Sequence, residues 1–196
     1  AWAFTDEIYE YIVYDGREHV SMASLESCRD LTITISGFSK TFSITGWRIG
    51  YVAAPPAMAS KIGLVNDLFY VCAPTPVQWG VARGLDVPKS YYDDLCSDYQ
   101  QKRDMLSEAL TAAGMTPHVP QGTYYMLAEV QGAGFRSADE AAQALLERAR
   151  VAAVPGTAFF QSSRGESLLR FCFAKDFEPL SEACSRIASL ASLPAK

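Results

Sequence analysis

The chain has 196 residues, of which 49% are hydrophobic and 20% charged, and its formal net charge is −5. This composition is typical of a globular protein with a buried core. Lysines and arginines are scattered along the chain, which excludes the basic footprint of a nucleic-acid partner. No apolar run approaches the roughly 20 residues of a membrane helix, and no signal-peptide pattern opens the chain. We expect neither a nucleic-acid partner nor a membrane partner.

The cysteines give no sign of a disulfide framework or a zinc site. They are odd in number, widely spaced and never arranged as C-x-x-C: Cys28, Cys72, Cys96, Cys172 and Cys184. This usage favours a reducing compartment, so a cytoplasmic location is expected.

The first half of the chain opens with "AWAFTDEIYEYIVYDG", which reads as the end of a strand followed by a patterned segment. Residues 31–35, "LTITI", and residues 47–55, "WRIGYVAAP", predict two strands, joined by a loop that holds Lys40. Helices are predicted from residue 56 to about 70 and from 76 to about 85, each opened by a proline near its first turn.

The second half begins with a long helix, predicted from Ser90 to a stop at Gly114. Its apolar residues recur every four or seven positions, and Ser90 with Asp93 resembles a capping box. The remaining segments predict three strands, "GTYYMLAEV", "VAAVPG" and "LLRFCFA", and two helices, at residues 137–150 and from 179 to about 193.

The segment around Lys40 carries the strongest chemical signal. A lysine among small residues between two strands is partly desolvated, which favours its neutral amine and makes it a nucleophile toward an aldehyde. The plain alternative is a solvated loop lysine. Nearby glycines permit close backbone approach, hydroxyl side chains surround the loop, and Arg48 has the paired N–H donors that grip a phosphate.

The run "GFSKTFSITGWRIG", residues 37–50, resembles the lysine-attachment signature of class I and II pyridoxal-phosphate-dependent aminotransferases of fold type I. The resemblance implies that Lys40 forms the Schiff base with pyridoxal 5'-phosphate (PLP) and that Arg48 binds its phosphate. Many members of the family have a serine where this chain has Gly37. The hydroxyl groups nearest to this position, which could replace that serine as a phosphate ligand, belong to Ser36 and Ser39.

Two further matches complete the set of candidate residues. The stretch "DEIYEYIVYDG" resembles the family's Asp-x-x-Tyr motif, which implies that Asp6 pairs with the pyridine nitrogen of PLP and Tyr9 contacts its phenolic oxygen. Without the resemblance, Asp6 would be interpreted as a cap or turn residue and Tyr9 as a core aromatic. Arg170, inside an apolar strand, either faces solvent at a strand edge or meets an anion. The resemblance favours the anion, namely the α-carboxylate of a substrate.

Other residues carry weaker signals. His19 and His118 have no carboxylate or cysteine at ligand spacing and read as surface or loop residues, and no metal site is predicted. Tyr124 or Tyr125 is a candidate lining of a substrate pocket, although a half-buried strand explains both equally well.

The resemblance covers the whole chain but only the C-terminal half of such an enzyme, and the chain opens with Ala1, so we expect a piece of a longer protein. It implies an α/β fold in which residues 1–85 end a large cofactor-binding domain with a mixed, mostly parallel sheet. Residues 86–113 form a connecting helix, and residues 114–196 form a small α+β C-terminal domain.

The implied function belongs to amino-acid metabolism: transfer of an amino group between an amino acid and a 2-oxo acid, in a homodimer. A PLP-dependent β-lyase or decarboxylase of the same family is an alternative, and so is a catalytically incomplete remnant that acts as an interaction module. The 196-residue chain taken alone is expected to be inactive, because positioning of the cofactor needs groups from the rest of the family fold.

Overall fold

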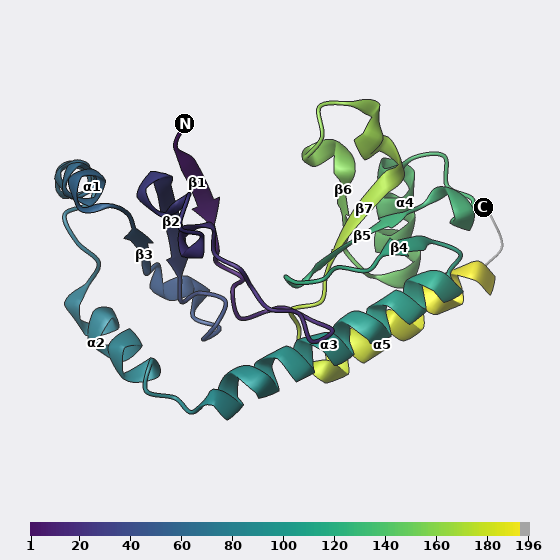
Figure 1. Ribbon diagram of the computed structural model, residues 1–196. Helices are drawn as coiled ribbons and strands as arrows, with labels where there is room; N and C mark the ends of the chain where they lie inside the picture. The colour runs from purple at the N-terminus through teal and green to yellow at the C-terminus, as the bar shows by residue number, and fades with distance from the viewer. Residues whose placement is uncertain (193–196) are drawn as a thin grey trace. The chain divides into compact units, whose positions relative to one another are not determined.

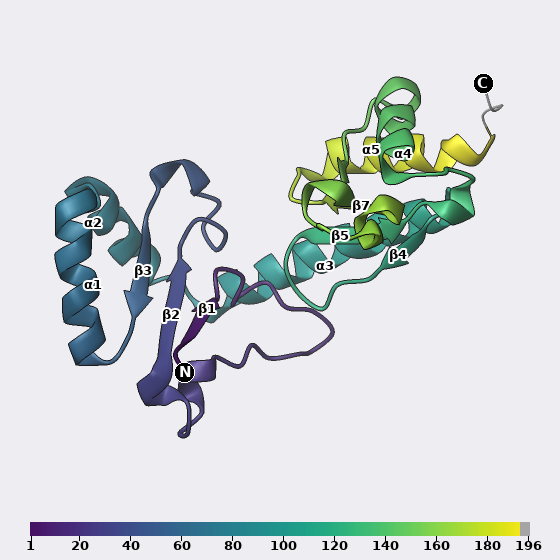
Figure 2. The same cartoon turned by 90° about the horizontal axis from the view of Figure 1, so that it is seen from above.

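The computed structural model describes residues 1–192, which fold as two compact units that meet in sequence between Cys96 and Ser97. Each unit has its own β-sheet with its own helices, as Figures 1 and 2 show. The lysine loop belongs to the first unit and Arg170 to the second.

The first unit is built on a three-stranded sheet in the order β1 (Ala3–Asp6), β2 (Thr32–Gly37), β3 (Gly50–Ala53). β1 and β2 are parallel, whereas β2 and β3 are antiparallel. The sheet is mixed, as predicted, but within these residues it is not mostly parallel. The strand predicted from Trp47 starts only at Gly50, because Arg48 has φ 54° and leaves the β region.

Two helices follow at the predicted places, α1 (Pro56–Phe69) and α2 (Thr75–Gly84), each with proline in its first turn. None of the described residues of α1 is buried. Several large apolar side chains on and after α1 are more than half exposed: Leu64, Val65, Leu68, Phe69, Tyr70 and Val71. An apolar surface of the first unit is therefore open to solvent.

The long helix α3 (Lys89–Ala112) is present, and it leads from the first unit into the second. It starts one residue earlier than predicted, so Ser90 lies inside the helix and the proposed capping box is wrong. Asp93 instead accepts a hydrogen bond from the Lys89 Nζ at 2.6 Å. Leu106 and Leu110 on this helix are almost fully buried.

The second unit has an antiparallel sheet in the order β4 (Thr116–His118), β5 (Tyr125–Glu129), β7 (Leu168–Cys172), β6 (Val154–Pro155). One face is core, since Met126, Ala128, Leu169 and Phe171 are at most 3% exposed. Alternation along the strands places Arg170 on the other face. Strand β4 was not predicted, because three residues with a central proline carry no alternating pattern.

The helices of the second unit are α4 (Ala138–Ala144), continued by a π-helical turn (Leu145–Ala149), and α5 (Phe177–Ala188). The predicted single helix from residue 137 to 150 is thus an α-helix with a π-helical end, capped at Ser137. Leu193, given as the end of the last predicted helix, lies outside the described residues. Short 3₁₀ turns cover Met22–Ser24, Arg29–Leu31, Thr45–Trp47, Gln131–Ala133, Gly156–Ala158, Ser163–Ser167 and Ser189–Ser192.

Within residues 1–192, no helix combines the length and the apolar character required to cross a membrane.

Candidate active site

Lys40 lies in the turn that follows β2, and its side chain is half-buried. The turn is anchored beside the lysine, because the hydroxyl of Tyr91 donates a hydrogen bond to the carbonyl oxygen of Thr41 at 2.7 Å. The Lys40 amine stands 6.0 Å from the centre of the Tyr9 ring. An amine in these surroundings is partly shielded from water and next to a phenol.

The two ends of the lysine loop are held together by a pair of glycines. Gly37 of β2 and Gly50 of β3 are register partners. A Cβ added at Gly37 would lie 3.0 Å from the Gly50 Cα, and one added at Gly50 would lie 2.7 Å from the carbonyl oxygen of Ser36. The absence of side chains lets the strands approach and closes the loop that carries Lys40 and Arg48.

Replacing Gly50 by alanine should therefore destabilise the chain by roughly 1–3 kcal/mol, the usual cost of forcing atoms into a filled site. Urea unfolding of the 196-residue chain would measure it. Gly63→Ala is the matched control: nothing lies within 4 Å of its Cβ, and it sits inside α1. That change should stabilise by about 0.5–1 kcal/mol through helix propensity. A Gly50→Ala variant as stable as the wild type would contradict the close packing.

Arg48 has a left-handed backbone, with φ 54° and ψ 47°. This conformation costs a non-glycine residue about 1 kcal/mol or more, and such strain concentrates at functional sites. One Nη1 donor bonds the carbonyl oxygen of Thr45 at 3.0 Å. The guanidinium makes no other hydrogen bond within the described part of the chain, so most of its five N–H donors remain available to an anion.

Asp6 ends β1 and pairs in register with Ile35, five residues before Lys40. Its carboxylate is exposed and accepts a hydrogen bond from the backbone N–H of Ile8 at 3.2 Å, which orients it. Tyr9 lies in the turn that follows. The parallel pairing of β1 and β2 thus brings the "DEIY" segment and the lysine loop to neighbouring strand ends.

Arg170 lies on β7 in the second unit, and its guanidinium group contacts two aromatic rings. Its guanidinium carbon is 4.3 Å from the centre of the Tyr125 ring and 4.1 Å from that of Phe159. Among residues 1–192 it forms no hydrogen bond or ion pair, so its N–H donors are unused. Stacked aromatic rings leave the edge of a guanidinium free, and that edge is the part that binds a carboxylate in a bidentate pair.

The two tyrosines of the "GTYYMLAEV" segment have different places. Tyr124 is buried and stacks on Tyr99, with ring centres 5.9 Å apart, so it belongs to the core. Tyr125 is the one beside Arg170. Burial raises the pKa of Tyr125, with Tyr124 and Cys172 acting in the same direction and Arg170 against them. Its hydroxyl therefore stays protonated at neutral pH.

His19 and His118 both lie at the surface, as expected, but in the folded chain each has a carboxylate partner that spacing along the sequence did not reveal. His19 Nε2 lies 3.0 Å from a Glu7 carboxylate oxygen, and His118 Nε2 lies 3.4 Å from one of Glu129. Sequence spacing missed these pairs because folding, not proximity along the chain, brings the partners together. In the described residues no group of three metal-ligating side chains occurs.

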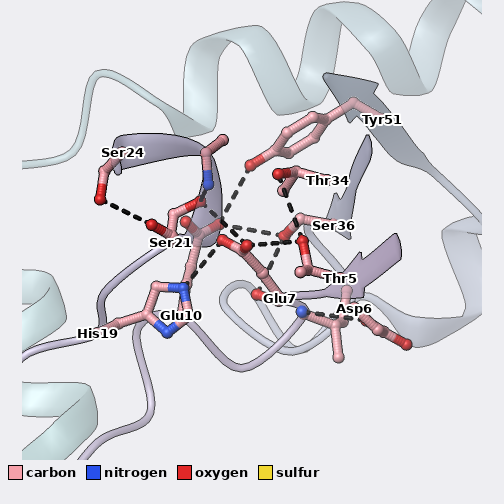
Figure 3. Close-up of polar contacts among 12 residues, drawn as sticks. Thr5, Asp6, Glu7, Glu10, His19, Ser21, Ser24, Thr34, Ser36 and Tyr51 are labelled. Carbon is pink, nitrogen blue, oxygen red and sulfur yellow. Dashed lines mark hydrogen bonds and ion pairs between the residues drawn. The ribbon is translucent and has the colours of Figure 1, made fainter. Parts of the chain in front are cut away.

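Figure 3 shows where the Glu7 pair sits. Glu7, the residue after Asp6, collects hydrogen bonds from three side chains, and Ser36 is bound to Glu10 nearby. The Ser36 hydroxyl is thus engaged away from the lysine loop. Ser39 supplies its carbonyl oxygen to the Thr45 hydroxyl at 3.3 Å. Glu7 had no signal in the sequence beyond its position next to Asp6.

Comparisons with known proteins agree on one family. The family described as aminotransferase class I and II matches residues 1–187. The aromatic-amino-acid aminotransferase 2 of Thermococcus litoralis and the aspartate aminotransferase of Pyrococcus abyssi are each 35% identical over 185 residues, covering 93% of this chain and 47% of the relative. The chain spans about half the length of the curated relatives it matches.

Solved structures agree as well. The N-succinyldiaminopimelate aminotransferase of Mycobacterium tuberculosis superposes with a TM-score of 0.90 at 32% identity, over 96% of this chain and 50% of that one. The aromatic aminotransferase of Pyrococcus horikoshii OT3 gives 0.88 at 32%, over 97% and 51%. These structures are PLP aminotransferases of the α/β fold, and members of the family use PLP. The chain therefore belongs to the class I and II aminotransferase family.

Proposed function

We propose that the protein containing this chain is a PLP-dependent aminotransferase that moves an amino group between an amino acid and a 2-oxo acid. The observation that carries the proposal is the closed loop between Gly37 and Gly50, which holds a half-buried lysine and an arginine with unused donors. Family membership gives this loop its chemical meaning.

The residues of the first unit fit PLP. Lys40 supplies an amine for the aldehyde, Asp6 a carboxylate for the ring nitrogen, Tyr9 a phenol for the phenolic oxygen, and Arg48 a guanidinium for the phosphate. Lys40 and Tyr9 lie near each other, and Arg48 keeps most of its donors unused within the described residues. These are the groups that the cofactor's functional groups require.

When bound, PLP supplies an aldehyde that condenses with amines and a ring that accepts electrons from a carbanion. Lys40 would hold the cofactor through its Nζ, and the free Nζ would take the proton from the substrate α-carbon. The Asp6 carboxylate keeps the ring nitrogen protonated, and the Tyr9 hydroxyl orients the phenolic oxygen. Arg48 anchors the phosphate, and Arg170 binds the substrate α-carboxylate through its free edge.

The wider organisation is part of the same proposal. Residues 1–85 are the C-terminal part of the large domain, residues 86–113 the connecting helix, and residues 114–196 the small domain; the boundary between the two units inside α3 supports this division. The protein acts as a homodimer, which the exposed apolar side chains near α1 support. A cytoplasmic location is supported by five free cysteines.

The test is to mix the 196-residue chain, and any longer product of its gene, with PLP, an amino acid and 2-oxoglutarate. We expect glutamate and the keto acid of the donor, with its carbons retained, from the longer product and not from the chain alone. Release of ammonia with pyruvate, or of carbon dioxide, would favour a lyase or decarboxylase. Turnover by the chain alone would show that it holds all the residues the reaction needs.

A further inference from the structure

Glu7 is a buried charged residue that the proposed chemistry does not use. Its side chain is 7% exposed, yet it carries a carboxylate, a group that is rarely buried without partners. Thr5 Oγ1 donates to one carboxylate oxygen at 2.8 Å and Ser21 Oγ to the same oxygen at 3.0 Å, while His19 Nε2 lies 3.0 Å from the other (Figure 3). We refer to Glu7, Thr5, Ser21 and His19 as the Glu7 cluster.

These contacts keep Glu7 ionised. Burial is the largest single influence and raises the pKa of its carboxyl, but the hydrogen bonds from His19, Thr5 and Ser21, with the charge of His19, together outweigh it and lower the pKa. An ionised carboxylate binds its donors roughly twice as strongly as a neutral acceptor. The Glu7 cluster therefore ties the loop that holds His19 and Ser21 firmly to the end of β1.

The backbone of Glu7 is fixed as well. Its N–H donates to the carbonyl oxygen of Ile35 at 2.8 Å, and its carbonyl oxygen accepts from the Ser36 hydroxyl at 3.3 Å and the Glu10 N–H at 3.0 Å. Glu7 is thus pinned to β2 by its main chain and to the loop by its side chain.

The pinned residue lies between Asp6 and Tyr9. Asp6 precedes it directly and is exposed where Glu7 is buried, as expected for consecutive residues of an extended chain. Tyr9 follows within a turn whose far side is also fixed, since a Glu10 carboxylate oxygen lies 3.2 Å from both the Ser36 and the Tyr51 hydroxyls. Any shift of Glu7 is transmitted to Asp6 through one peptide unit.

We propose that Glu7 is a positioning residue: held by Thr5, Ser21 and His19, it sets the place from which Asp6 and Tyr9 meet the cofactor. The inference rests on the proposed function, because it gives Glu7 a role toward the group that Asp6 and Tyr9 would contact. Positioning matters to rate and affinity because displacements of about 1 Å weaken aligned polar contacts severely.

The test compares Glu7→Gln with Glu18→Gln in the PLP-loaded protein. Glutamine keeps the size of Glu7 but removes its charge and replaces one of its two acceptor oxygens by an NH2 donor. Glu18 is exposed in the same loop and makes no hydrogen bond or ion pair with residues 1–192, so its replacement removes one negative charge without breaking a polar contact. We expect Glu7→Gln to weaken PLP binding about tenfold, because the Glu7 cluster that positions Asp6 and Tyr9 loses one hydrogen bond to a charged group. The pH midpoint of the visible band of lysine-bound PLP should shift as well. Glu18→Gln should leave both unchanged.

The comparison of Glu7→Gln with Glu18→Gln also includes a measurement that needs no cofactor, amide hydrogen exchange, and a second variant of the Glu7 cluster. The Ile8 amide, which bonds the Asp6 carboxylate, should exchange its hydrogen faster in Glu7→Gln than in Glu18→Gln. Thr5→Val, which removes one donor from a strand position that suits valine, should change PLP affinity and exchange in the same direction by a smaller amount.

The outcomes separate the two proposals. A lower melting temperature with unchanged PLP affinity, band midpoint and Ile8 exchange would make Glu7 merely structural and overturn the inference. If the wild-type band is present and Glu7→Gln reproduces it, only the inference about Glu7 fails. If the wild-type protein forms no lysine-dependent band at all, the proposed function fails, and the role of Glu7 toward PLP fails with it.

Discussion

Replacing Lys40 by alanine is expected to lower amino-group transfer by about 10²–10⁴-fold or more, the range associated with loss of a positioned general base. The residue combines two roles in the proposed chemistry, attachment of the cofactor and proton transfer at the substrate α-carbon, and alanine performs neither. The measurement is single-turnover formation of the keto acid by the PLP-loaded protein. The visible band of lysine-bound PLP should be lost together with turnover.

Lys61 is the matched control, since it is an exposed lysine of α1 in the same unit. Lys61→Ala should retain both the visible band and turnover. Reduction of the wild-type protein with borohydride should attach the cofactor to the peptide that contains Lys40. Labelling of Lys61, or full turnover by Lys40→Ala, would show that another residue holds the cofactor.

Arg170→Lys is expected to raise the KM for both the amino acid and the 2-oxo acid by about 10–100-fold, with PLP affinity unchanged. Lysine keeps the charge but lacks the planar fork, so one of two charge-assisted hydrogen bonds is lost, at about 1.5–3 kcal/mol. The ammonium group also cannot stack in the same way between the Tyr125 and Phe159 rings. Steady-state kinetics with each substrate varied in turn would measure the change.

Arg164→Lys provides the comparison, because Arg164 is exposed in the same unit and has no hydrogen bond or ion pair with residues 1–192. It should leave KM within about twofold, the scatter expected for a surface substitution. A simple amine that lacks a carboxylate should gain relative to amino acids in Arg170→Lys alone. If KM stays at the wild-type value, the aromatic rings hold Arg170 for a structural reason.

The lysine loop shows what the sequence predicts well. Strand β2 and helix α1 occur close to where the β-rich run and the proline placed them, and a loop joins β2 to β3 as predicted, although β3 begins at Gly50 and not at Trp47. These signals are local, since a proline fixes its own φ and a glycine permits its own close contact. The same holds for α3, whose apolar repeat alone predicts most of its length.

What the sequence did not predict depends on distant partners. Glu7 and His19 are twelve residues apart, in a stretch with no periodicity, and only the folded loop brings them to 3.0 Å. The two rings that contact Arg170 come from β5 and from the segment after Gly156. Their positions therefore depend on both the register of the sheet and the path of a loop. Ser90 failed as a cap because the helix begins at Lys89.

The uncovered surface of α1 affects how the chain of residues 1–196 responds to temperature. Unfolding usually raises the heat capacity by about 12–15 cal/mol/K per residue, because buried apolar groups become hydrated. Leu64, Leu68 and Phe69 are already 74–83% exposed in the folded chain, so they add little to this increment. The curvature of the unfolding free energy plotted against temperature is proportional to this heat-capacity change. The chain by itself should therefore have a flatter stability curve than a protein of equal length whose helices are all covered.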